Sequence, residues 1–479
     1  MRSFAWLALG LLAGALAFGW WSRDRAVPSV APPPPAPMEP APTEPPRVAP
    51  APAQPATLAP TLVPGCSRTE GEPIGPSLAD TANERMGELW DRTRYLLNAG
   101  EGSEELRAGL RALLTQDTER AFAALRDAPD RVVDGFDIAS AAAFAQVIRA
   151  LGADGDPDAA LADLAAVAPE GALHPLAAAL VARQREDDAE ELAALTTAFA
   201  RTDDPAVAFA LASTATRQGQ SALGLEALRA YAAEYPDDEW ARGMLPLVAH
   251  RAEVESTMVE TTRGGVTLRH APGFGARSAR AVHEGILRAL HEAAELLGVE
   301  RRPTLVAILY PDRETLVAVT CGPEWTGGLF DGALRLDGGA RPESLAVTVR
   351  HESLHAQLAA VAPRAPLWLH EGLAQVFEER TPPALERTLT LMVRERTYVP
   401  FASLEGSFVV IDDAQSARFA YHQSYAMVAA LLDREGPDTL RRAVAHLRTG
   451  GDPTAVLSAM SARPFTGDEL LAWVEARDP

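Results

Sequence analysis

Leucine and alanine recur at every third or fourth position over much of residues 78–255, as in EELRAGLRALL (104–114). This spacing gathers the apolar side chains on one face of a helix. Short segments rich in glycine, aspartate and proline interrupt the pattern, for example GADGDPD (152–158) and RTDDPAV (201–207). The pattern therefore predicts an irregular array of helical hairpins, which either binds a partner or supports a neighbouring domain.

The pattern changes near residue 256, where apolar runs of strand length begin to alternate with amphipathic helices. Strands are predicted at GGVTLRHAP (264–272), PTLVAILYP (303–311) and GGLFDGALRL (327–336). Helices are predicted at 279–297, before the cap residue Gly298, and at 314–321, 342–360, 366–379, 384–397 and 419–436. A strand-like run, SFVVID (407–412), precedes the last helix. This alternation indicates an α+β domain.

The N-terminal residues have a different composition. Residues 4–21 are apolar and uncharged, which is long enough to cross a bilayer, and Trp20 and Trp21 suit its interface. The small residues around Leu16 also match the cleavage site of a signal peptide. We expect the body of the protein outside the cytoplasm in both cases, either anchored in the membrane (periplasmic or cell-surface) or secreted after cleavage. Residues 28–64 hold 15 of the 38 prolines and predict an extended linker.

These patterns predict a multidomain chain with four parts: a membrane anchor or signal peptide (1–25), a Pro/Ala-rich linker (26–77), an α-helical hairpin repeat region (78–255) and an α+β domain (256–479). The chain has 65 acidic and 44 basic residues, a net charge of −21 and no basic stripe, which argues against a nucleic-acid partner. The two cysteines, Cys66 and Cys321, are too few for a cysteine-ligated zinc site. They either form one disulfide or remain separate thiols, and we favour the thiols.

The segment VRHESLHAQL (349–358) carries the chemistry of the predicted α+β domain. Positions i and i+4 lie one turn apart on the same helix face, so His351 and His355 can direct a ring nitrogen at one ion. Glu352 then lies beside the ion, where it can act as a base. The alternative is a helix that contains two histidines by coincidence. Another pair, His283 and His291, has no such spacing and is expected on a solvated face.

A catalytic zinc ion takes three protein ligands and keeps one open position. The segment PLWLHEGLAQVFEE (366–379) predicts a second helix one short loop after the first. Its Glu371 follows His355 by sixteen residues and is the natural third ligand.

The pair of motifs HESLH (351–355) and WLHEGLA (368–374) resembles the gluzincin metallopeptidases, the thermolysin and aminopeptidase N superfamily, and most of all the peptidase MA-like type. The resemblance covers about residues 256–450. It implies that His351, His355 and Glu371 bind Zn²⁺ and that Glu352 is the general base. Upstream, AYAAEYPDD (230–238) loosely resembles the second helix of a tetratricopeptide repeat, which makes residues 78–255 tetratricopeptide-like.

The same resemblance implies an oxyanion donor, a tyrosine on a later helix. Tyr421 matches it best, and Tyr425, one turn further on, is the alternative. It also implies that the strand at 327–336 edges the cleft and pairs with an extended substrate. His370 stands where the aminopeptidases usually carry asparagine; it can approach the metal or contact a ligand, but we expect a surface histidine. The exopeptidase signature of the type G-x-M-E-N is absent, which puts recognition of a free N-terminus in doubt.

Two hypotheses for the function follow. The first is a zinc-dependent metallopeptidase, tethered outside the cytoplasm, which hydrolyses peptide or protein substrates. The second is a membrane-tethered helical-repeat interaction module whose zinc domain is structural or nearly inactive. The presence of Glu352 favours the first hypothesis, because a purely structural zinc site does not require it.

Overall fold

The computed structural model describes residues 78–477, except 101, 116, 134–135, 153–154, 186, 323–325, 379–382 and 405–413. The described chain forms two compact units, one of residues 78–216 and 220–246 and the other of residues 217–219 and 247–477. The predicted anchor, the predicted linker and the strand-like run at 407–412 lie outside the described residues. Among the helices of the described part, none is both long and apolar enough to span a membrane.

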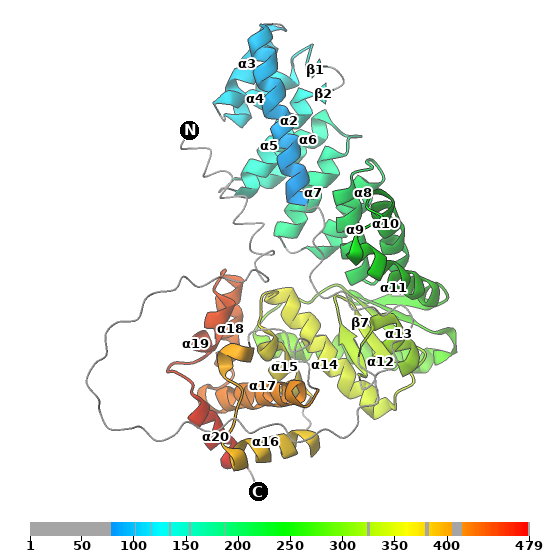
Figure 1. Ribbon diagram of the computed structural model, residues 1–479, viewed down its shortest axis with the longest axis vertical. Coiled ribbons are helices and arrows are strands. Elements are labelled where there is room, and N and C mark those ends of the chain that lie inside the picture. The colour runs from blue at the N-terminus through cyan, green and yellow to red at the C-terminus, as the bar shows by residue number, and fades with distance from the viewer. Residues whose placement is uncertain are drawn as a thin grey trace, which may run out of the picture. The chain divides into compact units, whose positions relative to one another are not determined.

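The first unit is almost entirely helical, and consecutive helices pack in pairs, α3 on α4, α5 on α6 and α7 on α8 (Figure 1). Its helices are α2 (Leu78–Ala99), α3 (Glu104–Leu114), α4 (Thr118–Arg126), α5 (Ile138–Gly152), α6 (Pro157–Val167), α7 (Leu173–Gln184), α8 (Asp188–Phe199), α9 (Pro205–Arg217), α10 (Ser221–Glu234) and α11 (Glu239–Glu255), the last continuing into the second unit. The side chains of Asp117, Asp156 and Asp187 cap three of them by accepting first-turn N–H groups. One short hairpin, β1 (Val132–Val133) and β2 (Phe136–Asp137), was not predicted.

The second unit contains a mixed five-stranded sheet with the order β3-β4-β5-β7-β6. The strands are β3 (Val259–Arg263), β4 (Val266–His270), β5 (Leu305–Tyr310), β6 (Gly328–Phe330) and β7 (Leu334–Asp337). The three central strands run parallel, and both edge strands run antiparallel to their neighbours. The prediction of one strand over 327–336 is wrong, because the chain turns at Gly332, whose φ of 105° favours glycine, and returns as a hairpin.

Helices cover both faces of this sheet (Figure 1). On one face, α12 (Ala276–Leu297) and α14 (Pro342–Val361) bury apolar residues such as Ile286, Leu290 and Val349 against the strands. On the other face, α13 (Arg313–Thr320) packs beside the end of α11. The prediction of a solvated His283 is wrong: only 2% of this residue is exposed, and its Nε2 lies 3.3 Å from the carbonyl oxygen of Arg263. Cys321, after α13, is in a disulfide, contrary to the preference for free thiols.

A buried ionic cluster joins the end of α11 to the sheet. Arg335 on β7 is fully buried and donates to Glu255 on α11 (3.2 Å) and to Asp331 in the hairpin turn (2.9 Å). Tyr310 on β5 donates to the same Glu255 oxygen at 2.7 Å. Removing one partner of such a cluster typically costs about 3–5 kcal/mol, because it leaves a buried charge uncompensated. The end of α11 is therefore an integral part of the second unit.

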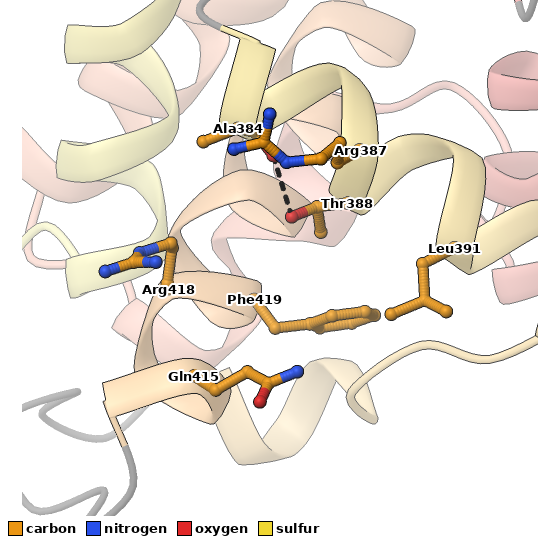
Figure 2. A pocket seen from close by; sticks show the side chains of 7 residues that line it. All are labelled: Ala384, Arg387, Thr388, Leu391, Gln415, Arg418 and Phe419. Carbon is orange, nitrogen blue, oxygen red and sulfur yellow. Dashed lines mark hydrogen bonds between the residues drawn. The ribbon is translucent and has the colours of Figure 1, made fainter. Parts of the chain in front are cut away.

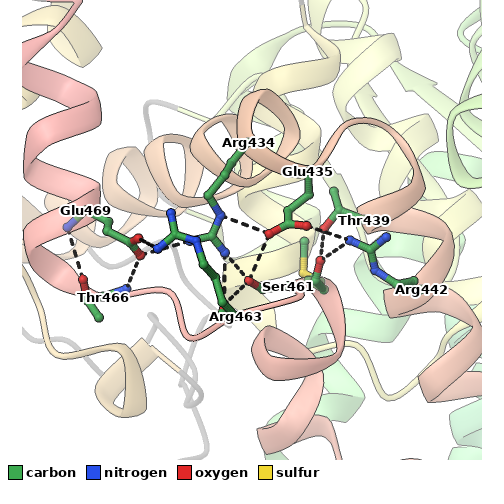
Figure 3. A network of polar contacts seen from close by, with 9 residues as sticks. Arg434, Glu435, Thr439, Arg442, Ser461, Arg463, Thr466 and Glu469 are labelled. Carbon is green, nitrogen blue, oxygen red and sulfur yellow. Dashed lines mark hydrogen bonds and ion pairs between the residues drawn. The ribbon is translucent and has the colours of Figure 1, made fainter.

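The remaining helices form a separate apolar cluster beside α14. They are α15 (Leu367–Phe377), α16 (Pro383–Glu395), α17 (Ala414–Glu435), α18 (Asp438–Arg448), α19 (Val456–Met460) and α20 (Gly467–Glu475). A polar network holds the end of α17 in place (Figure 3). Arg434 pairs with Glu435 (3.1 Å) and with Glu469 on α20 (3.0 Å), and Arg442 on α18 reaches Glu435 at 3.5 Å. This network fixes the C-terminal end of the helix that carries Tyr421.

Candidate metal centre

Helices α14 and α15 bring His351, His355 and Glu371 together. Pro342 occupies the first turn of α14, where its missing N–H costs nothing, and α15 begins after Pro366. Glu371 Oε2 lies 3.5 Å from His351 Nε2, and Glu371 Oε1 lies 3.6 Å from His355 Nε2. All three donor atoms lie within 4.8 Å of one another.

This geometry suits a single metal ion and can be compared with the spacing around zinc. Two ligands that lie about 2.0–2.1 Å from zinc at a tetrahedral angle are roughly 3.3–3.4 Å apart. The two nitrogen–oxygen distances in the site are only slightly longer. The side chains of His351, His355 and Glu371 are 20%, 10% and 11% exposed, so the site is nearly enclosed but can still be reached from solvent.

Two further side chains orient the histidines. Glu378 accepts a hydrogen bond from Nδ1 of His351 at 2.7 Å, which leaves Nε2 free to bind an ion. Nδ1 of His355 lies 3.3 Å from Nδ1 of His370. Burial lowers the pKa of His370 to about 4, so this ring is neutral and can accept the Nδ1–H of His355. His370 is partly exposed and contacts the ligand His355, which is the less favoured of the two predictions made for it.

Glu378 was missed in the sequence, although a signal was present. It follows Glu371 by seven residues, which is two helical turns, so both carboxylates project from the same face of the chain leaving α15. What the sequence could not show is that Glu378, two turns after Glu371, reaches Nδ1 of His351.

The charges of the metal-free site favour a cation. Burial alone would lower the pKa of His351, but its hydrogen bonds to Glu371 and Glu378 outweigh burial and raise the pKa well above its usual 6.5. Burial and the neighbouring His351 and His370 lower the pKa of His355. His351 therefore carries a second proton on Nε2, facing Glu371, and a metal ion that binds there displaces it.

Glu352 follows the first histidine on α14 and is 6% exposed. Burial, the largest cause, and the carboxylates of Glu371 and Glu378 raise its pKa, and His351 together with the backbone N–H of Phe330 on β6 opposes them. The resulting pKa is about 7. A carboxyl group with this pKa can both accept and return a proton near neutral pH. The edge strand β6 thus directly contacts the residue predicted to be the base.

Tyr421 on α17 lies close to the acidic groups of the site. Burial and the carboxylates of Glu371 and Glu352 raise the pKa of this phenol, which therefore stays protonated as a hydrogen-bond donor. Gln375 on α15 donates to the backbone oxygens of Glu371 (3.1 Å) and Tyr421 (2.8 Å), which ties the two helices together at this level. The choice between Tyr421 and Tyr425 as oxyanion donor stays a prediction.

Comparison with known proteins gives no match, neither to a protein-family model nor to a curated protein sequence. The resemblance to gluzincins accordingly depends on the two motifs and on the geometry described above. The fold and the site define a mostly α-helical protein with a small mixed sheet and a buried His-His-Glu cluster that can bind a metal ion.

Proposed function

We propose that this protein is a zinc-dependent metallopeptidase that hydrolyses peptide bonds, with His351, His355 and Glu371 as zinc ligands. The observation that carries the proposal is a buried carboxyl group, Glu352, which follows one of three converging ligands on α14 and interacts electrostatically with His351 and Glu371. Two imidazole nitrogens and one carboxylate oxygen are a donor set that suits zinc and leaves a fourth position open. A structural zinc site has four protein ligands and has no use for such a base.

Zinc, when bound, supplies the Lewis acid that polarises the scissile carbonyl and lowers the pKa of a water molecule. Glu352 accepts the proton of the attacking water and returns it to the leaving amine. Tyr421 donates its phenolic hydrogen to the developing oxyanion, where a hydrogen bond gains strength in the transition state. Glu378 and His370 hold the two histidines in the tautomer that presents Nε2.

We further propose that the enzyme acts outside the cytoplasm, tethered by residues 4–21 or released after cleavage. The composition of this segment and of the proline-rich linker supports this location. The helical array of the first unit supports a role in binding a protein partner or a large substrate, because such arrays present extended surfaces.

The experiment that tests the function compares the zinc-loaded parent with Glu352→Gln in a peptide-library digestion analysed by mass spectrometry. We expect the parent to release fragments, Glu352→Gln to keep its zinc but release none, and a chelator to abolish cleavage by the parent. Glu300→Gln, at an exposed loop position, is the matched control and should cleave like the parent. Equal cleavage by Glu352→Gln and the parent would contradict the proposal.

A further inference from the structure

A hollow of about 460 Å³ lies between α16 and the first turns of α17 (Figure 2). Its lining comes from both helices: Ala384, Arg387, Thr388, Leu391, Gln415, Arg418 and Phe419. Figure 2 shows the two guanidinium groups toward one end of the hollow and the side chains of Phe419 and Leu391 toward the other. The hollow thus has a cationic end and an apolar end.

Arg387 and Arg418 differ from other arginines of the same two helices. Arg394 on α16 pairs with Glu395, and Arg434 on α17 pairs with Glu435. Neither Arg387 nor Arg418 forms an ion pair with an acidic group in the described part of the chain. Both side chains are exposed, and they give the hollow a local positive charge in a protein whose net charge is −21.

The positive potential of the two arginines also acts on a neighbouring histidine. His422 on α17 is 8% exposed, and its Nδ1 lies 2.7 Å from the hydroxyl of Thr388 in the lining. Burial, and to a smaller extent the charges of Arg418 and Arg387, lower the pKa of His422 to about 4. His422 is therefore neutral, and the positive charge of the hollow belongs to the arginines alone.

The chemistry of the hollow matches an acidic group with a short aliphatic stem. Guanidinium groups bind carboxylates through paired, charge-assisted hydrogen bonds. Leu391 and Phe419 offer apolar contact to the methylene groups of the same ligand. Arg418 precedes Tyr421 by three residues, about one helical turn, so the hollow begins close to the part of α17 that faces the metal centre.

We propose that this hollow is a specificity site for a carboxylate of the peptide substrate, held by Arg387 and Arg418. The inference rests on the proposed peptidase function and adds to it a preference for acidic peptides. The carboxylate comes either from a glutamate or aspartate side chain or from the C-terminus of the peptide, and the two sources present the same chemistry to the arginines.

Binding measurements test this proposal without turnover. The full-length, zinc-loaded Glu352→Gln protein is titrated with fluorescent hexapeptides of alanine that carry one glutamate at each successive position and an amidated C-terminus. A matched set carries glutamine in place of glutamate, and one alanine hexapeptide has a free C-terminal carboxylate. The same titrations are repeated after adding Arg387→Gln with Arg418→Gln, and after adding Arg394→Gln as the control on α16.

We expect glutamate at one position, or the free C-terminus, to raise the affinity about tenfold, because charge-assisted pairs near the surface are of modest strength. The double arginine variant should lose this preference, and Arg394→Gln should keep it. Which peptide gains affinity identifies the source of the carboxylate. Equal affinity for all peptides, including no binding of any, or an unchanged preference in the double variant would overturn the proposal.

Zinc content and cleavage by the parent, measured on the same preparation, separate this inference from the proposed function. A zinc-loaded protein that cleaves peptides but shows no preference for a carboxylate refutes the specificity site alone. If the parent neither binds zinc nor cleaves peptides, the proposed peptidase function is refuted. If that parent still binds acidic peptides and the double variant does not, the anion site stands.

Discussion

The substitution Glu352→Gln should stabilise the metal-free protein at alkaline pH. Glu352 is 6% exposed, and its carboxyl group has a pKa of about 7, compared with 4.5 in an unfolded chain. The folded protein therefore binds this proton more tightly than the unfolded chain. Between pH 4.5 and 7 the free energy of unfolding falls as the pH rises, and above pH 7 the full cost of the buried charge is present.

A change of one unit in a pKa corresponds to about 1.4 kcal/mol, so the rise in the pKa of Glu352 from 4.5 to about 7 corresponds to about 3 kcal/mol. Glutamine has the same shape without the charge, so Glu352→Gln should unfold with a free energy up to about 3 kcal/mol higher than the parent at pH 8. At pH 4 the difference should nearly vanish. The measurement is urea denaturation of the chelated proteins at both pH values, with only the transition of the second unit expected to shift.

The exposed Glu300→Gln is the control and should leave both curves unchanged. Two results would refute the argument that Glu352 is a buried and unfavourable charge. One is equal stability of Glu352→Gln and the parent at pH 8, and the other is a difference in unfolding free energy that grows as the pH falls. The expected result would show a residue retained despite its cost to stability, as is common for groups that serve catalysis.

Three further changes test other parts of the site. Glu378→Gln should weaken zinc affinity about 10–100-fold in a chelator competition, since it removes the carboxylate that orients one ligand; unchanged affinity would contradict this role. Tyr421→Phe should lower kcat about 10²–10³-fold with zinc content unchanged, whereas Tyr425→Phe should have little effect, and the reverse result would exchange their roles. Gly372→Ala should destabilise the second unit by about 1–3 kcal/mol in urea denaturation, because its Cβ would lie 2.3 Å from a backbone oxygen of α17. Gly285→Ala, with space for a Cβ on α12, should be neutral or stabilising by up to about 1 kcal/mol; equal effects of the two would contradict the tight packing.

The sequence predicts those features that depend only on neighbouring residues, such as helices and the side chains that share a helix face. The spacing of His351 and His355 places both on one helix face in any α-helix, and the structure has them there. The periodicity of leucine and alanine predicted the helical character of residues 78–255 and located several helices of the second unit for the same reason. Glu371 followed from the short loop between two predicted helices, and the structure places its carboxylate between the two histidines.

Features that depend on distant parts of the chain were not predictable. Arg335 is fully buried although it is charged, because Glu255 lies 80 residues earlier in the sequence and pairs with it. His283 looked solvated because its own helix is amphipathic, but the carbonyl of Arg263 on a neighbouring strand covers it. The contact between His370 and His355 likewise depends on how α15 crosses α14. A single sequence contains no direct information on such contacts.

The zinc content of the purified protein, compared with that of Glu371→Ala by elemental analysis, is the most direct test of the central claim. With His351, His355 and Glu371 as ligands, the parent should contain about one zinc per chain, and the variant should lose most of it. A parent that binds no zinc after repletion, or a variant that retains the full amount, would contradict the metal centre and with it the peptidase.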